Sequence, residues 1–209
     1  MTSWVELPAT DVDVAAQLLL GWRLTANGVT VRLTEVEAYS GLGEDPASHA
    51  HRGVTNRNRV MFGPAGRLYV YQIYGMHFCA NVVCGETGKA AAVLLRAGAV
   101  IDGLEIARER RPAARKDIDL AAGPAKLMQV LALNRDANGS SLLDGTGPAA
   151  LSPPADPASP DGPAYEIEAG PRVGVTSAHD VPWRFWISGD PTVSSYRRHT
   201  PRRNRDMFR

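Results

Sequence analysis

The sequence has little cysteine and no long apolar run. Its two cysteines, Cys79 and Cys84, lie five positions apart in an apolar segment of a 209-residue chain. Two thiols cannot form the disulfide framework of a small secreted domain, so we expect both to be free and buried. The longest apolar runs, such as residues 90–95, are too short to cross a bilayer, and the first residues lack a basic-then-apolar signal pattern. We therefore expect a cytoplasmic globular protein with no membrane partner.

Lysine is also scarce. Of the 23 basic residues only three are lysine: Lys89, Lys116 and Lys126. The arginines gather in three clusters, at 52–67, 108–115 and 197–209. A planar guanidinium group suits phosphates and aromatic faces, so these clusters are compatible with a nucleic-acid partner although the net charge is only +1. A coding bias toward arginine would explain the same clusters.

Hydrophobic periodicity predicts an α+β fold in one domain spanning residues 1–209. Hydrophobic residues make up 44% of the chain, which is enough for a substantial core. Helical spacing predicts helices at 11–20, with Thr10 as the N-cap, and at 101–111 and 124–133. Apolar patterning predicts strands at 29–39, 68–73, 77–83, 90–97, 164–168, 173–175 and 183–188. The proline-rich stretch 144–164 is typical of a surface loop, and residues 197–209 form an arginine-rich C-terminal tail.

The strand predicted at 29–39 ends in two carboxylates and an aromatic ring. Residues two apart on a regular strand point to the same side, so Glu37 and Tyr39 would project together and share one wall of a pocket. Glu35 lies on the same face and is a rival candidate for an acid–base role. Arg96, in the apolar run 90–97, needs a partner if it is buried, and Glu37 is a candidate.

The next stretch, residues 40–66, is polar and contains two histidines, His49 and His51. A loop of this length inside a compact domain is usually functional or disordered, and the arginines, asparagines and apolar residues near its end favour function. Two histidines without a third ligand at suitable spacing are weak evidence for a metal. We expect no metal site and no cofactor.

A hairpin is predicted by the β-rich runs 68–73 and 77–83, which are separated by a turn that contains Gly75. Tyr74 would lie at its tip, where a large aromatic side chain gains little from core burial. Such a residue is suited to entering a base stack; in the alternative interpretation it folds back onto its own sheet. Lys126, in the first turn of the helix predicted at 124–133, would meet a phosphate or stay solvated.

Seven short motifs occur in order along nearly the whole chain: Val36-Glu37-Ala38-Tyr39, Ser48-His49, Asn56-Arg57-Asn58-Arg59-x-Met61-Phe62, Leu68-Tyr69-Val70-Tyr71-x-x-Tyr74-Gly75-Met76, Asn81, Leu94-Leu95-Arg96 and Gly123-Pro124-Ala125-Lys126-Leu127. Together they resemble the alkyladenine (3-methyladenine) DNA glycosylase family. The resemblance implies a curved antiparallel β-sheet flanked by helices, with a protruding β-hairpin. It also implies a monofunctional, monomeric enzyme, nucleoid-associated in a bacterium, that flips damaged purines out of double-stranded DNA and hydrolyses the N-glycosidic bond. The implied lesions are 3-methyladenine, 7-methylguanine, hypoxanthine and ethenoadenine.

The resemblance further implies a role for each matching residue. Glu37 would be the general base that activates a water molecule, held together with Arg96. The flipped base would stack on Tyr39 in a pocket completed by His49, Tyr71 and Asn81, and Tyr74 would fill the gap in the duplex. The arginine clusters and the helix start suggest DNA backbone contacts for Arg57, Arg59 and Lys126. Four parts of the chain depart from the family pattern: Ser40, residues 42–45, the proline-rich stretch and the arginine-rich tail. These departures concern lesion preference and non-specific affinity rather than the reaction.

Two other classes of function stay open. One is a non-catalytic protein that binds damaged DNA, which the presence of Glu37 and Arg96 disfavours. The other is an N-glycoside hydrolase of free nucleosides, which Tyr74 and the arginine clusters disfavour. A zinc deaminase is poorly supported because its His-x-Glu and Pro-Cys-x-x-Cys ligands are absent. Strand cleavage needs an amine nucleophile, and no lysine lies between residues 37 and 81, so we expect no lyase activity.

Overall fold

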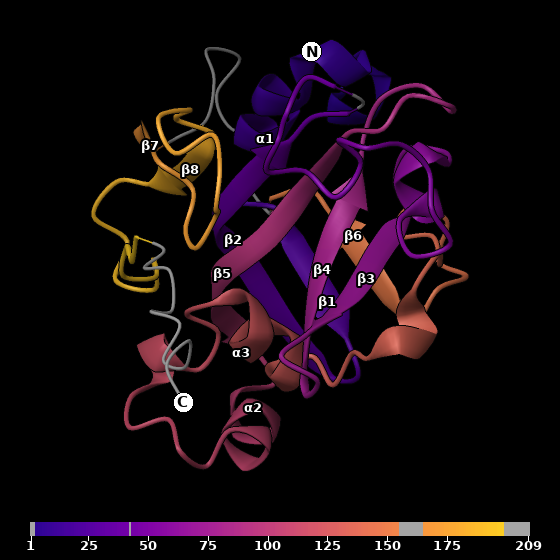
Figure 1. The fold of residues 1–209 in the computed structure, drawn as a ribbon. Coiled ribbons are helices and arrows are strands. Elements are labelled where there is room, and N and C mark those ends of the chain that lie inside the picture. Colours follow the sequence, from indigo (N-terminus) through magenta and orange to yellow (C-terminus); the bar gives the residue numbers. More distant parts are fainter. Residues whose placement is uncertain (1–2, 42, 155–164, 199–209) are drawn as a thin grey trace, which may run out of the picture.

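A computed structural model describes residues 3–41, 43–154 and 165–198. Its centre is a curled antiparallel sheet that resembles half a barrel (Figure 1). The strands run in the order β3-β4-β5-β2-β1-β6, and β8 adds to β2 and carries β7. Their bounds are β1 (Arg23–Ala26), β2 (Val29–Tyr39), β3 (Leu68–Ile73), β4 (His77–Val83), β5 (Ala92–Asp102), β6 (Ala149–Ser152), β7 (Ile167–Gly170) and β8 (Arg184–Ile187).

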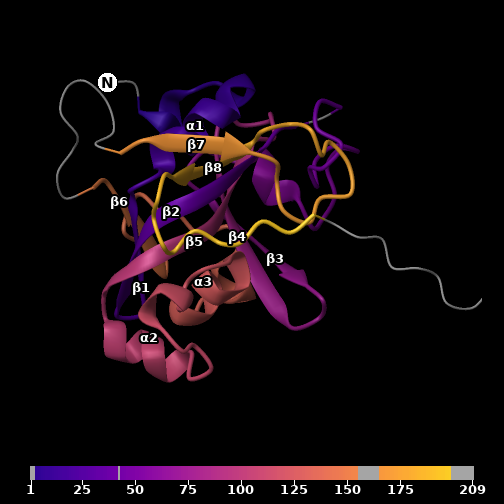
Figure 2. The same ribbon diagram turned by 90° about the vertical axis from the view of Figure 1, so that its left-hand side faces the viewer.

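Three α-helices pack on this sheet in the described part of the chain: α1 (Val12–Leu19), α2 (Leu104–Arg110) and α3 (Pro124–Val130). Short 3₁₀ turns lie at Trp4–Glu6, Ala9–Asp11, Arg59–Phe62, Asp117–Asp119 and Arg135–Ala137. Helix α1 lies against β2, and α3 lies against β4 and β5, at opposite ends of the molecule (Figures 1 and 2). Both helices contribute to one core, with Leu19 and Leu127 fully buried in it. The predicted α+β fold with a curved sheet and a hairpin is confirmed.

Strand β2 organises the sheet because it pairs with three other strands. Its first half pairs with β1, its second half pairs with β8, and β5 runs along its other edge. The pairing with β5 is irregular around Glu35, where a β-bulge shifts the register. Before the bulge Val31 and Leu33 face the main core, whereas after it Val36 and Ala38 do. The bulge therefore turns Glu35, Glu37 and Tyr39 away from that core, since successive side chains alternate.

Several predicted boundaries were wrong. Strands β1 and β6 were missed, and β6 lies inside the stretch 144–164 that was predicted to be a loop. The turn between β1 and β2 is Asn27-Gly28, with both residues at positive φ, as a tight hairpin requires. Strand β6 forms because it pairs with the free edge of β1. Residues 155–164 and 199–209, which hold the latter half of the proline-rich stretch and most of the arginine-rich tail, lie outside the described residues.

The remaining differences concern element ends. Strand β5 runs on to Asp102, so the helix predicted from 101 starts at Leu104, after Gly103 at a φ of 71°. Helix α3 starts at Pro124 as predicted but ends at Val130, and Ala132 has a φ of 48°. Residues 173–175 are not a strand, and the strand predicted at 164–168 begins at Ile167. Thr10 is not the N-cap of α1, because the 3₁₀ turn Ala9–Asp11 precedes the helix and the N-cap is Asp11.

Two predictions from the sequence concern its few cysteines and its lack of long apolar runs. Cys79 and Cys84 are both free and buried, as expected. Among the described residues, no helix combines the length and the apolar character that crossing a membrane requires.

Candidate active site

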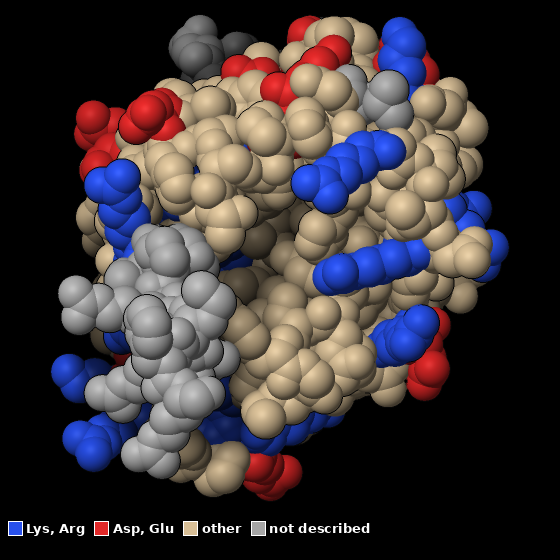
Figure 3. All heavy atoms as spheres, in the orientation of Figure 1, with Lys and Arg blue, Asp and Glu red and all other residues tan. Residues whose placement is uncertain are grey.

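A cavity of about 670 Å³ opens on the face of the molecule between the sheet, the hairpin and the start of α3. Figure 3 shows this hollow near the middle of the face, with arginine and lysine side chains around it. Eight of the ten residues predicted for the site line the cavity: Glu37, Tyr39, His49, Tyr71, Tyr74, Asn81, Arg96 and Lys126. The other two, Arg57 and Arg59, are exposed and do not line it.

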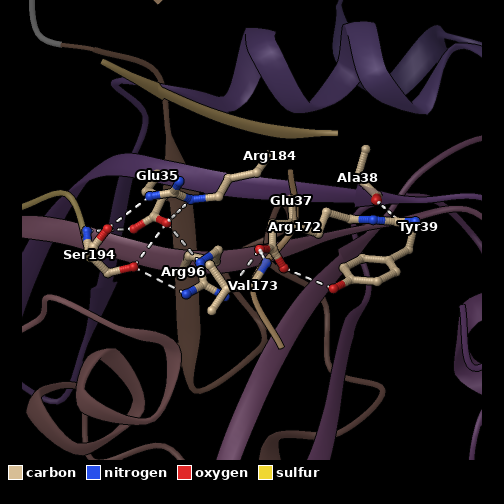
Figure 4. Close-up of polar contacts among 9 residues, drawn as sticks. All are labelled: Glu35, Glu37, Ala38, Tyr39, Arg96, Arg172, Val173, Arg184 and Ser194. Atoms are coloured by element: carbon tan, nitrogen blue, oxygen red, sulfur yellow. Dashed lines mark hydrogen bonds and ion pairs between the residues drawn. The ribbon is translucent and has the colours of Figure 1, made fainter. Parts of the chain in front are cut away.

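Glu37 is completely buried at the wall of the cavity. Its Oε1 accepts a hydrogen bond from the backbone N–H of Val173 at 2.7 Å and lies 3.2 Å from Arg96 Nη1. Its Oε2 accepts a hydrogen bond from the hydroxyl of Tyr39 at 2.8 Å (Figure 4). The ion pair between Glu37 and Arg96 that the sequence suggested is therefore present, and Glu37 and Tyr39 do project together.

Glu35 is equally buried but does not line the cavity. Its Oε1 accepts hydrogen bonds from Arg96 Nε at 2.9 Å, Arg184 Nε at 2.6 Å and the Ser194 hydroxyl at 3.0 Å. Its Oε2 accepts one from the backbone N–H of Ser194 at 2.8 Å. Burial alone would raise the pKa of Glu35, but the two guanidinium groups outweigh it and lower the pKa. Glu35 is thus a charged anchor for two arginines.

Aromatic rings from β3 and the 40–66 loop form another wall. The ring of His49 contacts that of Tyr71 edge-on at 4.7 Å, and its Nδ1 lies 3.1 Å from the hydroxyl of Tyr69. Burial, with a contribution from Arg57, lowers the pKa of His49 to about 4, so its imidazole is neutral at pH 7. Burial raises the pKa of the Tyr71 hydroxyl well above its ordinary value. The wall is therefore uncharged and suited to a planar, mostly apolar ligand.

Tyr39 also lines the cavity, and Arg172 packs against its ring. The guanidinium carbon of Arg172 lies 4.6 Å from the centroid of the Tyr39 ring and 5.5 Å from that of Trp183. Arg172 also forms a two-pronged ion pair with Asp45, with N–O distances of 2.6 and 2.8 Å. Both partners are almost inaccessible to solvent.

The hairpin tip stands at the mouth of the cavity. Tyr74 has a φ of 50° in the turn and its side chain is 87% exposed. Met76 beside it is 69% exposed. Tyr74 therefore does not fold back onto its own sheet. Asn81, on β4, lines the cavity and its Nδ2 donates to the backbone carbonyl of Tyr69 at 3.3 Å.

The basic candidates differ in position. Lys126 lines the cavity from the first turn of α3. The exposed Arg57 places its guanidinium carbon 5.7 Å from the centroid of the Tyr71 ring, so it lies beside the aromatic wall. Arg59 begins the 3₁₀ turn Arg59–Phe62 and is exposed.

One thiol, that of Cys79, lines the cavity. Burial raises the pKa of this thiol to about 11, so it is not a ready nucleophile. Within residues 3–41, 43–154 and 165–198, no group of three or more His, Cys, Asp and Glu side chains is arranged to hold a metal ion.

Sequence reasoning missed five residues that support the site: Asp45, Arg172, Val173, Arg184 and Ser194. Asp45 and Arg172 are 127 positions apart, and Glu35 and Ser194 are 159 apart. No local pattern reports such pairings. One indirect signal was present, since arginines in apolar surroundings such as Arg184 need buried partners.

Comparison with known proteins agrees with this geometry. Residues 6–191 match the model of the methylpurine-DNA glycosylase family. A protein of Nocardia farcinica named as a 3-methyladenine DNA glycosylase is 54% identical over 198 residues, covering 93% of this chain and 91% of that protein. Similarly named proteins of Streptomyces avermitilis and Mycobacterium leprae are 50% and 45% identical, covering 95% and 90% of this chain and 92% and 86% of their own lengths. The chain belongs to the methylpurine-DNA glycosylase family.

Proposed function

We propose that this protein is a monofunctional DNA glycosylase that removes alkylated, deaminated and etheno purines from double-stranded DNA. The observation that carries the proposal is the position of Glu37, a buried carboxylate that faces a cavity and is held by Arg96, Val173 and Tyr39. Hydrolysis of an N-glycosidic bond needs a positioned water and a base for its proton. A carboxylate and a guanidinium group on one cavity wall meet this need.

In the proposed reaction Glu37 accepts a proton from water as the water attacks the sugar carbon that carries the damaged base. Arg96 orients this water and compensates the charge of the carboxylate through its Nη1, 3.2 Å from Glu37 Oε1. The C–N bond breaks, and its electron pair leaves with the purine. General base catalysis of this kind contributes roughly 10²–10⁴-fold to a rate.

The cavity accounts for how a purine would be held. Tyr39, His49 and Tyr71 all line it, and we propose that a planar base stacks against their rings. Asn81 lines the same cavity and presents an amide to the edge of the base. We propose that this amide discriminates against the exocyclic amine of guanine.

A base inside a duplex cannot reach the cavity, so the nucleotide must be flipped out of the stack. We infer that Tyr74 enters the duplex from the minor groove and occupies the vacated position, because it stands 87% exposed at the cavity mouth. Exposed Arg57 and Arg59, together with Lys126, are the proposed DNA backbone contacts. We further propose that the enzyme acts in the cytoplasm as a monomer with a single domain over residues 1–209.

The position of Lys126 bears on whether the enzyme is monofunctional. No lysine lies between residues 37 and 81, but the fold brings Lys126 to the cavity, so an amine is present there. We still propose hydrolysis by water, because Glu37 rather than Lys126 is held at hydrogen-bonding distance by three separate groups. Borohydride trapping, which captures a Schiff base between an amine and the sugar, tests this point: no covalent protein–DNA product is expected.

The central experiment incubates the protein with duplexes that carry 3-methyladenine, 7-methylguanine, hypoxanthine or ethenoadenine, followed by alkaline cleavage at abasic sites. We expect base release from lesion duplexes but not from undamaged DNA. Glu37→Gln should bind lesion DNA normally and release bases roughly 10²–10⁴-fold more slowly. Glu168→Gln is the matched control, because it changes an exposed glutamate on β7, and it should release bases at the wild-type rate. Unchanged release by Glu37→Gln would remove Glu37 as the base.

The two other classes of function are outcomes of the same experiment. Binding of lesion duplexes without release by the wild-type protein would indicate a non-catalytic damage-binding protein. Release from free nucleosides but not from duplexes would indicate a nucleoside hydrolase.

The role of Tyr74 has its own test. Tyr74→Ser removes the exposed ring at the cavity mouth but leaves Tyr39, His49 and Tyr71 in place. Binding of a lesion duplex should therefore weaken at least about tenfold, as expected when a stacking contact worth about 1–3 kcal/mol is lost. Binding of a free damaged purine should change little. The control is Val14→Ser, which removes an exposed apolar side chain on α1 and should leave both affinities unchanged. Equal losses of both affinities in Tyr74→Ser would refute the flipping role.

A further inference from the structure

The Tyr39 ring has different environments on its two sides. Tyr39 lines the cavity, whereas Arg172 does not line it and its side chain has no exposed surface. The guanidinium carbon of Arg172 lies 4.6 Å from the ring centroid (Figure 4). The ring therefore separates a buried cation from the space in which a flipped base would stack.

The charge of this cation is balanced by Asp45. Two nitrogens of Arg172 donate to the two oxygens of Asp45 at 2.6 and 2.8 Å, and one of them also donates to the carbonyl of Ala38 at 2.9 Å. Asp45 is only 2% exposed, so water screens the pair poorly. The net charge behind the ring therefore depends on the presence and position of the Asp45 carboxylate.

A cation on one face of an aromatic ring weakens the attraction of the other face for a second cation. Purines alkylated at N3 or N7 carry a positive charge, whereas hypoxanthine and ethenoadenine are neutral. A base stacked on Tyr39 would lie about 8 Å from the guanidinium group, given a stacking distance of ~3.5 Å. An uncompensated charge at that distance, at an effective dielectric constant of about 20, changes an equilibrium roughly tenfold or more.

We propose that Asp45 and Arg172 form a charge-balancing pair behind Tyr39 that sets the preference of the enzyme between cationic alkylpurines and neutral damaged purines. Neither residue touches the base, so both act on specificity through the Tyr39 ring. This inference rests on the proposed glycosylase function. It assigns a task to two buried residues that the hydrolysis step does not use.

The test compares single-turnover release of 7-methylguanine with that of hypoxanthine from otherwise identical duplexes. The ratio of the two rate constants is the readout, because the intrinsic reactivity of each lesion cancels when variants are compared. Asp45→Asn leaves Arg172 uncompensated and should lower the ratio of 7-methylguanine to hypoxanthine release roughly tenfold. Asp45→Asn combined with Arg172→Gln removes both charges and should return the ratio to the wild-type value or above it.

Glu166→Gln is the control, since it removes an exposed acid outside this loop and should leave the ratio unchanged. If Asp45→Asn does not fold, Arg172→Gln alone tests the inference. Removing the cation should raise the ratio of 7-methylguanine to hypoxanthine release. Equal losses on both lesions in these variants would mean that the pair only stabilises the fold, and would overturn the inference. A wild-type protein that releases neither lesion would instead refute the proposed function.

Discussion

The two glutamates at the end of β2 are two positions apart, share one side of the strand and are both completely buried, yet their surroundings differ. Glu35 accepts four hydrogen bonds, two of them from the guanidinium groups of Arg96 and Arg184, and does not line the cavity. Glu37 faces the cavity and pairs with a single guanidinium group, that of Arg96. Burial is therefore the same, but access to a ligand is not.

This difference indicates how the work is divided between the two carboxylates. Arg96 links them, because its Nε binds Glu35 and its Nη1 lies beside Glu37. Its Nη2 donates to the hydroxyl of Ser194, so each nitrogen has its own partner. We infer that Glu35 positions Arg96, which leaves Glu37 as the carboxylate available to a water. A rival base at Glu35 would have to give up hydrogen bonds before it could accept a proton.

Neutralising each glutamate in turn should produce the largest difference between the two. Glu35→Gln should lower the free energy of unfolding by about 3–5 kcal/mol, because removing one partner of a buried ion pair leaves an uncompensated charge. Glu37→Gln should cost less, about 1–2 kcal/mol, because Arg96 keeps Glu35 as its partner. Urea denaturation followed by tryptophan fluorescence measures both values.

Base release should rank the two variants in the opposite order. Among folded molecules, Glu35→Gln should retain far more activity than Glu37→Gln, whose loss of the base costs about 10²–10⁴-fold. A Glu35→Gln variant as stable as Glu37→Gln and equally inactive would contradict the division of labour, and would restore Glu35 as a candidate base.

The pattern of apolar residues in β2 indicates the direction in which Glu35 and Glu37 point. The apolar residues of β2 fall at the odd positions Val29, Val31 and Leu33 and then at the even positions Val36 and Ala38. This switch marks the bulge beside Glu35. The prediction assumed a regular strand, which was enough to place Glu37 and Tyr39 together but not to say which face they occupy. The adjoining hairpin with Asn27-Gly28 was likewise readable and was missed.

The supporting pairs could not be predicted in the same way. The pairing of Asp45 with Arg172 depends on how a loop and a distant segment meet over Tyr39. Individual motifs, by contrast, are short-range patterns, and their order along the chain was enough to indicate the family. Lys126 of α3 and Glu37 of β2 line the same cavity, although 89 positions separate them in the sequence.

Of the substitutions that separate the roles of Glu35 and Glu37, Ser194→Ala should have the smallest effect. The Ser194 hydroxyl accepts a hydrogen bond from Arg96 Nη2 at 3.1 Å and donates one to Glu35 Oε1 at 3.0 Å, so its loss affects Glu35 and Arg96 but not Glu37 directly. We expect a loss of about 1 kcal/mol in the free energy of unfolding and at most a few-fold slower base release. The control is Ser188→Ala, whose hydroxyl bonds to exposed Glu168 and should cost almost nothing. A Ser194→Ala variant with wild-type stability but base release as slow as in Glu37→Gln would contradict this division of roles. It would show that the contacts of Arg96 with Glu35 and Ser194 take part in the reaction and do not only hold Arg96 in position.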